Sequence, residues 1–272
     1  MFKLLLARFQ HGHRTVGYPD APPTLPDRLR GAPRIDATKC DQGCRECADA
    51  CPTDAITISP DQSGKETGTE ISLDMGKCLF CVDCTSACPK GAIELTDDYR
   101  LAARKRDDLI VTGDFTPRAK ALDVEIKGLF GRSLKLRQVS AGGCNACEAD
   151  VNVLGTIVFD LGRFGIQMVA SPRHADGLLV TGPVSRNMHL ALKKTWDAVP
   201  APKIVIAVGA CAISGGPYIG HQEVHGGADR VVPVDLYVPG CPPHPFTILD
   251  GLLSLLGRID AADAGWRERI TR

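Results

Sequence analysis

Twelve cysteines are the residues of this sequence with the clearest capacity for chemistry. They fall into three groups of four, at positions 40, 44, 47 and 51, then 78, 81, 84 and 88, then 144, 147, 211 and 241. The start, MFKLLLARFQHGHR, has an apolar run of only three leucines, so we expect no secretory leader and a cytosolic chain. In that compartment, close-spaced cysteines favour metal binding over disulfides.

The first eight cysteines form an internal repeat. Its second half reads Cys78-x2-Cys81-x2-Cys84-x3-Cys88-Pro89, the run that binds a ferredoxin [4Fe–4S] cluster, with the fourth cysteine ligating the other cluster of a pair. The first half has one extra residue before Cys44, which Gly43 can absorb at positive φ. The repeat predicts two clusters, one bound by Cys40, Cys44, Cys47 and Cys88, the other by Cys51, Cys78, Cys81 and Cys84. Structural zinc is the alternative, although zinc sites do not need three thiolates in one tight loop.

The last four cysteines predict a third four-thiolate site. Cys144 and Cys147 lie in a glycine-containing loop, AGGCNACEAD, between a strand-like LRQVS and an apparent helix over 146–161. Two ligands are too few for a cluster, and Cys211 and Cys241 are the cysteines that remain downstream. Both also follow strand-like runs, KIVIAV and DLYV. Strands of an open parallel sheet present ligands at their carboxyl ends, so Cys144, Cys147, Cys211 and Cys241 can meet at one edge.

These patterns divide the chain into four parts. We expect an amphipathic helix and extended arm over 1–35, an α+β ferredoxin-like two-cluster domain over 36–112, a linker over 113–135, and an α/β flavodoxin-like domain over 136–272. The last domain should have an open parallel sheet, because its apolar runs are nearly continuous, and further helices over 185–198 and 245–256. The N-terminal helix can lie on a membrane or against a neighbouring subunit, and the sequence does not choose between them.

Charge and missing motifs exclude several function classes. The chain has 32 Lys and Arg against 32 Asp and Glu, so its formal charge is zero, whereas nucleic-acid binders carry a basic excess. AGGCNAC lacks the G-x-G-x-x-G spacing of dinucleotide sites, so we expect neither flavin nor NAD. No apolar run reaches the length of a membrane-spanning helix.

Three stretches carry a family resemblance. ASPRHADGLLVTGPVSRNM, VIAVGACAISGG and DRVVPVDLYVPGCPP resemble the complex I subunit that carries the terminal [4Fe–4S] cluster, and equally the small subunit of [NiFe] hydrogenases. The pair Cys144-Asn145-Ala146-Cys147 resembles the hydrogenase spacing, since complex I subunits have adjacent cysteines there. The cysteine repeat resembles the two-cluster subunit of the same complexes. The chain therefore resembles a fusion of that subunit with the small subunit of membrane-bound, complex I-related [NiFe] hydrogenases of the formate hydrogenlyase or hydrogenase-4 type.

The resemblance implies a function. The chain would be an electron-transfer subunit with three [4Fe–4S] clusters, an oxidoreductase subunit without a complete active site or catalytic residue of its own. A hydrogenase-type or complex I-type large subunit would hold the active site, beside membrane subunits, with this chain peripheral on the cytoplasmic face. A quinone-reducing, nickel-free complex I-like module is the alternative in the same class.

Three further side chains are candidates for a position around the third cluster. Glu148 can relay protons near the partner's active centre or simply interact with the helix dipole as a first-turn acid. Arg173 and His174, in the SPRHAD stretch, can stabilise a reduced cluster as nearby cations or lie on a surface loop.

Overall fold

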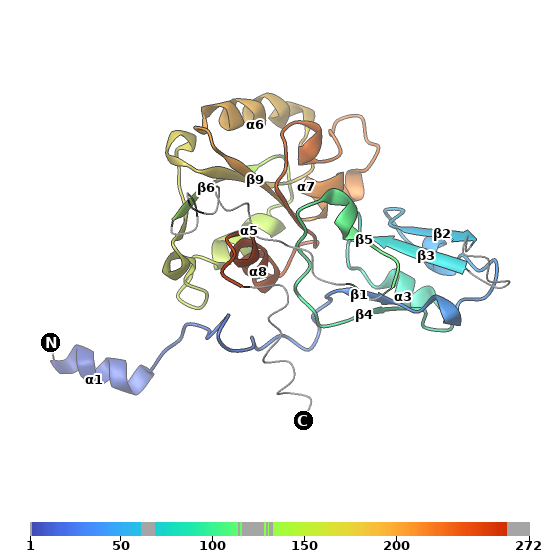
Figure 1. Cartoon of the computed structure of the whole chain (residues 1–272), viewed down its shortest axis with the longest axis horizontal. Coiled ribbons are helices and arrows are strands. Elements are labelled where there is room, and N and C mark those ends of the chain that lie inside the picture. Colours follow the sequence, from blue (N-terminus) through green and yellow to red (C-terminus); the bar gives the residue numbers. More distant parts are fainter. Residues whose placement is uncertain are drawn as a thin grey trace.

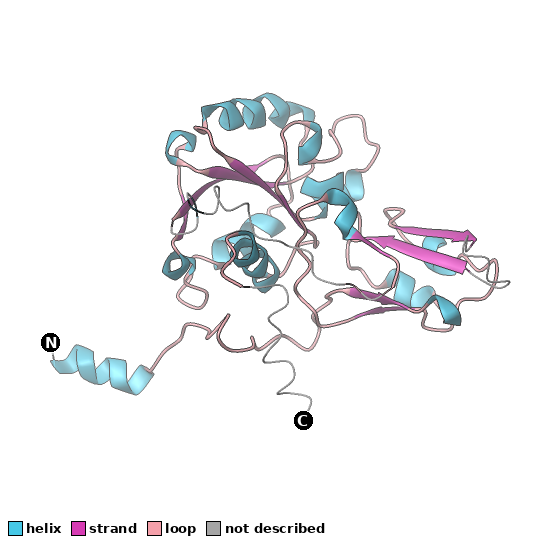
Figure 2. Cartoon of the chain, viewed as in Figure 1, coloured by secondary structure: helices cyan, strands magenta, loops and turns pink. Residues whose placement is uncertain are grey.

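The computed structural model of the chain describes residues 2–60, 69–113, 115, 128, 130 and 133–259. Two units lie side by side: a cysteine-repeat unit over residues 33–111, and an α/β unit over residues 134–255 (Figures 1 and 2). The expected linker over 113–135 lies mostly outside the described residues, as does most of the connector between the two halves of the repeat.

The cysteine-repeat unit is built from small antiparallel sheets and one-turn helices. Strands β2 (Ile56–Pro60), β3 (Thr69–Asp74) and β5 (Ile110–Val111) form one sheet, and β1 (Pro33–Ile35) pairs with β4 (Ile93–Leu95). In each half, the third cysteine lies in a short helix, α2 (Glu46–Asp49) or α3 (Asp83–Ala87), and a strand follows the Cys-Pro pair. Two 3-10 turns, Ala37–Lys39 and Arg106–Leu109, complete the unit.

The α/β unit contains a five-stranded parallel sheet, as the sequence predicts. Its strands are β6 (Leu134–Ser140), β7 (Ile166–Met168), β8 (Gly177–Thr181), β9 (Ile204–Val208) and β10 (Leu236–Val238), in the order β10-β9-β8-β6-β7. Every residue of β8, β9 and β10 is buried, which explains their unbroken apolar runs. The strand order reverses between β6 and β8, and ligands of open parallel sheets bind at such a switch point.

Helices cover both faces of this sheet. Helix α6 (Arg186–Ala198) lies on one face, and α5 (Ala146–Val153) and α8 (Pro245–Leu255) lie on the other (Figure 1). Leu178 and Val180 belong to the same apolar cluster as Leu192 of α6, whereas Leu179 belongs to the cluster that contains Val151 of α5 and Ile248 of α8. The short α7 (Ala210–Ser214) follows β9. Single 3-10 turns lie at Leu161–Phe164, Pro172–His174, Gly216–Tyr218 and Ala228–Arg230.

One expected helix ends earlier than predicted. The helix predicted over 146–161 stops at Val153, because the chain turns at Leu154 and Gly155 and resumes only as the turn at 161–164. The N-terminal helix expected within residues 1–35 forms as α1, which ends at His11 (Phe2–His11). Among the described helices, none is long and apolar enough to cross a membrane.

The N-terminal arm connects the two units. Val16 N–H bonds to Val158 O at 2.9 Å, and Tyr18 OH donates to Asp250 Oδ1 at 2.6 Å, both in the α/β unit. The arm then enters the other unit, where β1 pairs with β4. Direct contacts also join the units: Ala103 and Tyr237 exchange two backbone hydrogen bonds. The relative placement of the cysteine groups therefore depends on both the arm and these contacts.

Candidate metal centres

Four thiols meet at the carboxyl edge of the parallel sheet. Cys144 and Cys147 follow β6, Cys211 follows β9 and Cys241 follows β10, and these strands run in the same direction. The loops are tied together: Ala210 N–H donates to Gly240 O at 2.8 Å. Sheet direction and loop pairing thus bring all four cysteines of the third group to one place.

The charges of these thiols affect one another. Burial raises the pKa of Cys147, and the charges of Cys211, Glu148, Cys241 and Cys144 raise it further. The pKa of Cys211 is raised to about 11, mainly by burial and then by the charges of Cys241 and Cys144. Burial also raises the pKa of Cys241, so Cys147, Cys211 and Cys241 resist deprotonation and need a cationic centre beside them before they become thiolates. The donor set therefore fits a metal–sulfur group.

Glycine makes room for the sulfur atoms. Gly209 has φ of +91°, and a Cβ there would lie 2.5 Å from Cys147 Sγ. A Cβ at Gly216 would lie 2.8 Å from Cys211 Sγ. Both distances are too short for any side chain, so two backbone segments lie directly against the thiols. The sequence patterns did not predict this role for the two glycines, although each lies within six residues of Cys211.

Glu148 is buried at the start of α5 beside this group. Its Oε1 accepts hydrogen bonds from Ser140 Oγ at 2.6 Å and Thr181 Oγ1 at 2.7 Å. Burial alone would raise its pKa, but the two hydroxyl donors outweigh burial and hold the pKa below its usual value. A carboxylate held ionised in this way contributes a fixed negative charge, which makes it a poor carrier of a proton near neutral pH.

Cys51, Cys78, Cys81 and Cys84 line one cavity in the cysteine-repeat unit. Burial raises the pKa of Cys78 to about 12, with contributions from Cys84, Cys51 and Cys81. Backbone N–H groups point at two of the sulfurs: Ala55 N donates to Cys51 Sγ and Phe80 N to Cys78 Sγ, both at 3.3 Å. Such donors stabilise thiolate charge, so this set also fits a metal–sulfur group.

The loop around this cavity is strained. Phe80 has φ of +54° and Val82 has φ of +70°, a region that non-glycine residues avoid and β-branched residues avoid most. These conformations let the chain wrap Cys78, Cys81 and Cys84 around the cavity. Asn145, between Cys144 and Cys147, has φ of +74° in the same way. Strain in these cysteine loops is consistent with functional sites.

Cys40, Cys44, Cys47 and Cys88 form the remaining group. Burial raises the pKa of Cys40, and the charges of Cys44 and Cys88 raise it further. The pKa of Cys47 is raised in the same way, by burial first and then by the charges of Cys88 and Cys40. Burial also acts on Cys88, yet the backbone N–H groups of residues 90–93 lower its pKa, and Ala92 N lies 3.2 Å from its Sγ. Gly43 has φ of +80°, which confirms that it absorbs the extra residue of this loop.

The cavity group, which is Cys51, Cys78, Cys81 and Cys84, has a neighbour in each of the other two groups. Burial raises the pKa of Cys84 most, and the charges of Cys81 and Cys51 raise it further. Cys47, which belongs to the Cys40 group, is near enough to make a smaller contribution in the same direction. The pKa of Cys241 is raised mainly by burial and then by the charge of Cys144. The charge of Cys81, from the cavity group, makes a third and smaller contribution. Residues of the cavity group therefore lie close to residues of both other groups.

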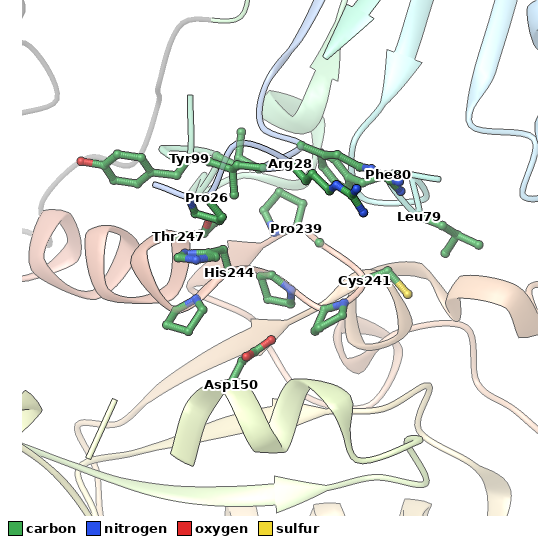
Figure 3. Close-up of a pocket in the computed structure, with 17 residues that line it drawn as sticks. Pro26, Arg28, Leu79, Phe80, Tyr99, Asp150, Pro239, Cys241, His244 and Thr247 are labelled. Carbon is green, nitrogen blue, oxygen red and sulfur yellow. The ribbon is translucent and has the colours of Figure 1, made fainter. Parts of the chain in front are cut away.

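A pocket of about 310 Å³ opens beside Cys241, between the two units (Figure 3). The arm contributes Pro26 and Arg28 to its wall, and the loop of the cavity group contributes Leu79 and Phe80. His244 also lines it; burial lowers its pKa, and its Nδ1 accepts from Phe246 N at 3.2 Å. The pocket gives solvent a route to the junction between the second and third groups.

Arg173 and His174 lie away from the third cysteine group. Arg173 and His174 lie before β8, at the amino end of the sheet, whereas the third cysteine group lies at the carboxyl end. Five residues of strand, about 16 Å, separate the two edges, which argues against the expectation that they surround the cluster. Among the described residues, no group of three or more His, Cys, Asp and Glu side chains is arranged to hold a single metal ion.

Comparison with known proteins shows two matching family models. The family model described as the NADH ubiquinone oxidoreductase 20 Kd subunit matches residues 144–255, and a 4Fe-4S dicluster domain model matches residues 39–92. The "Probable membrane-bound hydrogenase subunit mbhJ" of Pyrococcus furiosus is 43% identical over 130 residues, 48% of this chain and 78% of that protein. The chain belongs to the 20 kDa subunit family. The family resemblance expected from the sequence motifs is confirmed.

Other members of the 20 kDa subunit family are similarly close. Formate hydrogenlyase subunit 7 of Escherichia coli is 46% identical over 129 residues, which is 47% of this chain. The chain spans about half, 51%, of that relative's length. An NADH-quinone oxidoreductase subunit of Clostridium beijerinckii is 43% identical over 118 residues, 43% of this chain and 70% of that protein. Family members thus occur in both hydrogenase and quinone-reducing complexes.

Proposed function

We propose that this chain is the electron-transfer subunit of a membrane-bound [NiFe] hydrogenase complex related to complex I. Electrons pass through three [4Fe–4S] clusters to or from the active site of a partner large subunit. The observation that carries the proposal is the gathering of the cysteines in groups of four: one group lines a cavity, and another follows three parallel strands at the carboxyl edge of the sheet.

The proposed ligand sets are those that the cysteine spacing predicts. The first cluster takes Cys40, Cys44, Cys47 and Cys88. The second takes Cys51, Cys78, Cys81 and Cys84. The third takes Cys144, Cys147, Cys211 and Cys241. The mutual effects on thiol pKa within each set support this grouping, as does the cavity that the second set lines.

The chain's own residues would hold and tune these centres. A bound [4Fe–4S] cluster supplies reversible one-electron chemistry, at a potential that charge, burial and hydrogen bonds to sulfur set. The N–H groups of Ala55, Phe80 and Ala92 would stabilise the thiolates that they face. Glu148 would oppose reduction of the third cluster, because its carboxylate stays charged. The proposal requires neither flavin nor NAD.

The third site is where a partner would dock. Cys144 and Cys241 are the two cysteines of the chain that are exposed, and an exposed cluster would be open to water and oxygen. A large subunit that covers the carboxyl edge of the sheet would bury both and bring its active site beside the cluster. The strand order, 2-1-3-4-5 in chain order, supports a flavodoxin-like fold with this edge as its binding edge.

The nickel-free, complex I-like alternative has one supporting observation, the similarity to a subunit of an NADH-quinone oxidoreductase. The spacing of the first ligand pair favours the hydrogenase. Cys144 and Cys147 are separated by two residues, the arrangement that resembles hydrogenase small subunits.

Metal analysis of the purified complex tests the proposal. We expect about twelve iron and about twelve acid-labile sulfide per copy of this chain, in addition to any carried by its partners. We also expect stoichiometric nickel and hydrogen-dependent dye reduction. Iron without nickel would transfer the assignment to the complex I-like alternative, and zinc in place of iron would refute electron transfer. We place the complex at the cytoplasmic face of a membrane, with this chain peripheral.

A further inference from the structure

Helix α1 stands away from the rest of the molecule (Figure 1). None of its residues is buried, and the exposed fractions of Phe2, Leu4 and Phe9 are 79%, 75% and 89%. A helix of ten residues is marginally stable in water by itself, and most helices are stabilised by packing of an apolar face. The helix therefore needs a surface that the described part of the chain does not supply.

Four of the apolar side chains of α1 form one stripe, whereas Leu4 lies on the opposite face. Phe2, Leu5, Leu6 and Phe9 recur at intervals of three and four residues, which places them on one face of an α-helix. Lys3 and Arg8 lie at about 100° steps from that stripe, one on each flank. An apolar face bordered by cations on both sides is the pattern of a helix that lies in the plane of a membrane surface.

The charge of this segment has a single sign. Lys3, Arg8 and Arg14 precede the first acidic residue of the chain, Asp20, although acidic and basic residues balance over the whole sequence. A helix that packs on a protein usually meets charges of both signs. A segment that carries only cations complements a surface of uniform negative charge, and anionic lipid headgroups form such a surface.

The body of the protein continues this surface. The arm rejoins the α/β unit where Thr15 Oγ1 donates to Ile157 O at 2.8 Å. Ile157 itself is 73% exposed and Val158 is 41% exposed. Two exposed apolar side chains thus lie at the point where α1 is anchored, so a membrane under α1 would also meet this loop.

We propose that α1 lies in the surface of a membrane that contains anionic lipids. Phe2, Leu5, Leu6 and Phe9 enter the boundary of the acyl chains, while Lys3 and Arg8 contact phosphate groups. The inference deepens the proposed function and rests on it, since it identifies what holds the chain at the membrane. It involves only residues outside the metal sites.

Vesicle flotation of the full-length, cluster-loaded chain tests the inference. The chain should float with vesicles of phosphatidylcholine and phosphatidylglycerol in equal parts, and added salt should weaken the binding. Each Lys or Arg near an anionic surface strengthens binding about fivefold, so Lys3→Gln with Arg8→Gln should weaken binding about 25-fold. Leu5→Gln with Phe9→Gln should weaken it at least about tenfold, because two buried apolar side chains are lost.

A matched control separates α1 from general surface effects. Leu190 is 59% exposed on α6, which lies far from α1 in Figure 1, and Leu190→Gln should bind like the unaltered chain. Equal flotation of all variants, or equal affinity for vesicles of phosphatidylcholine alone, would overturn the inference. Absence of flotation would do the same and would point to a protein partner for α1. Iron content, measured on the same samples, reports separately on the proposed electron-transfer function.

Discussion

Cys81 and Cys241 come from different units of the chain, yet they lie near enough for the charge of Cys81 to raise the pKa of Cys241. The approach depends on contacts between the units. Ser214 Oγ donates to Gly76 O at 2.8 Å, and Ala103 pairs with Tyr237 through two backbone hydrogen bonds. These contacts between the two units therefore hold the second and third cysteine groups close together.

The ligand grouping makes a prediction about iron content. Cys51→Ala and Cys81→Ala should remove the same cluster, so the double variant should lose about four iron, no more than either single variant. Cys47→Ala combined with Cys51→Ala should lose about eight, although these two residues are closer in sequence. Iron and sulfide assays with electron paramagnetic resonance of the reduced protein would measure this. The opposite pattern would show that the fourth cysteine of each half binds its own cluster.

Gly209 provides a test of the third site. Gly209→Ala would place a Cβ 2.5 Å from Cys147 Sγ, so we expect loss of the third cluster while the first two remain. Gly220→Ala is the matched control, because Gly220 also has a positive φ, +78°, but nothing lies within 4 Å of its added Cβ. Both variants have a conformational cost of about 1–2 kcal/mol. If both lost equal iron, backbone strain and not contact with sulfur would be the cause.

The regular elements of the α/β unit were predictable from the sequence. Continuous apolar runs indicated the strands, and the helices predicted over 185–198 and 245–256 match Arg186–Ala198 and Pro245–Leu255 to within one residue at each end. The gathering of cysteines followed from sheet direction alone, because parallel strands place their carboxyl ends at one edge.

Other features could not be read from the sequence. Phe80 and Val82 adopt positive φ because the loop must turn its thiols inward, and residue type argues against that conformation. Arg173 and His174 belong to a motif that does not say at which edge of the sheet they lie. The path of the arm depends on a contact between Tyr18 and Asp250, which are 232 residues apart.

The arm makes a prediction about stability. Tyr18 OH donates to the buried carboxylate of Asp250 at 2.6 Å, so Tyr18→Phe should lower the free energy of unfolding by about 1.5–3 kcal/mol, the range for hydrogen bonds to charged groups. Tyr218→Phe, at a side chain that is 48% exposed, should change it little. Anaerobic thermal melts followed by circular dichroism would compare the two. Equal melting temperatures would mean that the arm does not stabilise the α/β unit.

Asp235 predicts a dependence of stability on pH. Burial raises its pKa, against the effects of Val205 N–H, which donates to Oδ2 at 2.8 Å, and of Arg104. A raised folded pKa means that stability is full below the unfolded pKa, near 3.8, and is lost as pH rises through the folded value. Asp235→Asn keeps an acceptor for Val205 and cannot ionise. Its stability relative to the unaltered chain should therefore increase from about pH 3 to about pH 7, and a constant difference would contradict this.

Glu148 tests whether the protein sets the potential of the third cluster. Glu148→Gln keeps an oxygen that can accept from Ser140 and Thr181 but removes a negative charge adjacent to Cys147. Reduction adds negative charge, so the variant should be easier to reduce, by about 1–2 kcal/mol if the charges lie about 10–15 Å apart at an effective dielectric constant of about 20. Its midpoint potential should rise in a titration followed by electron paramagnetic resonance. Asp160→Asn, at an exposed position, should leave it unchanged. An unchanged potential in Glu148→Gln together with slower turnover would instead support a role for Glu148 in proton transfer.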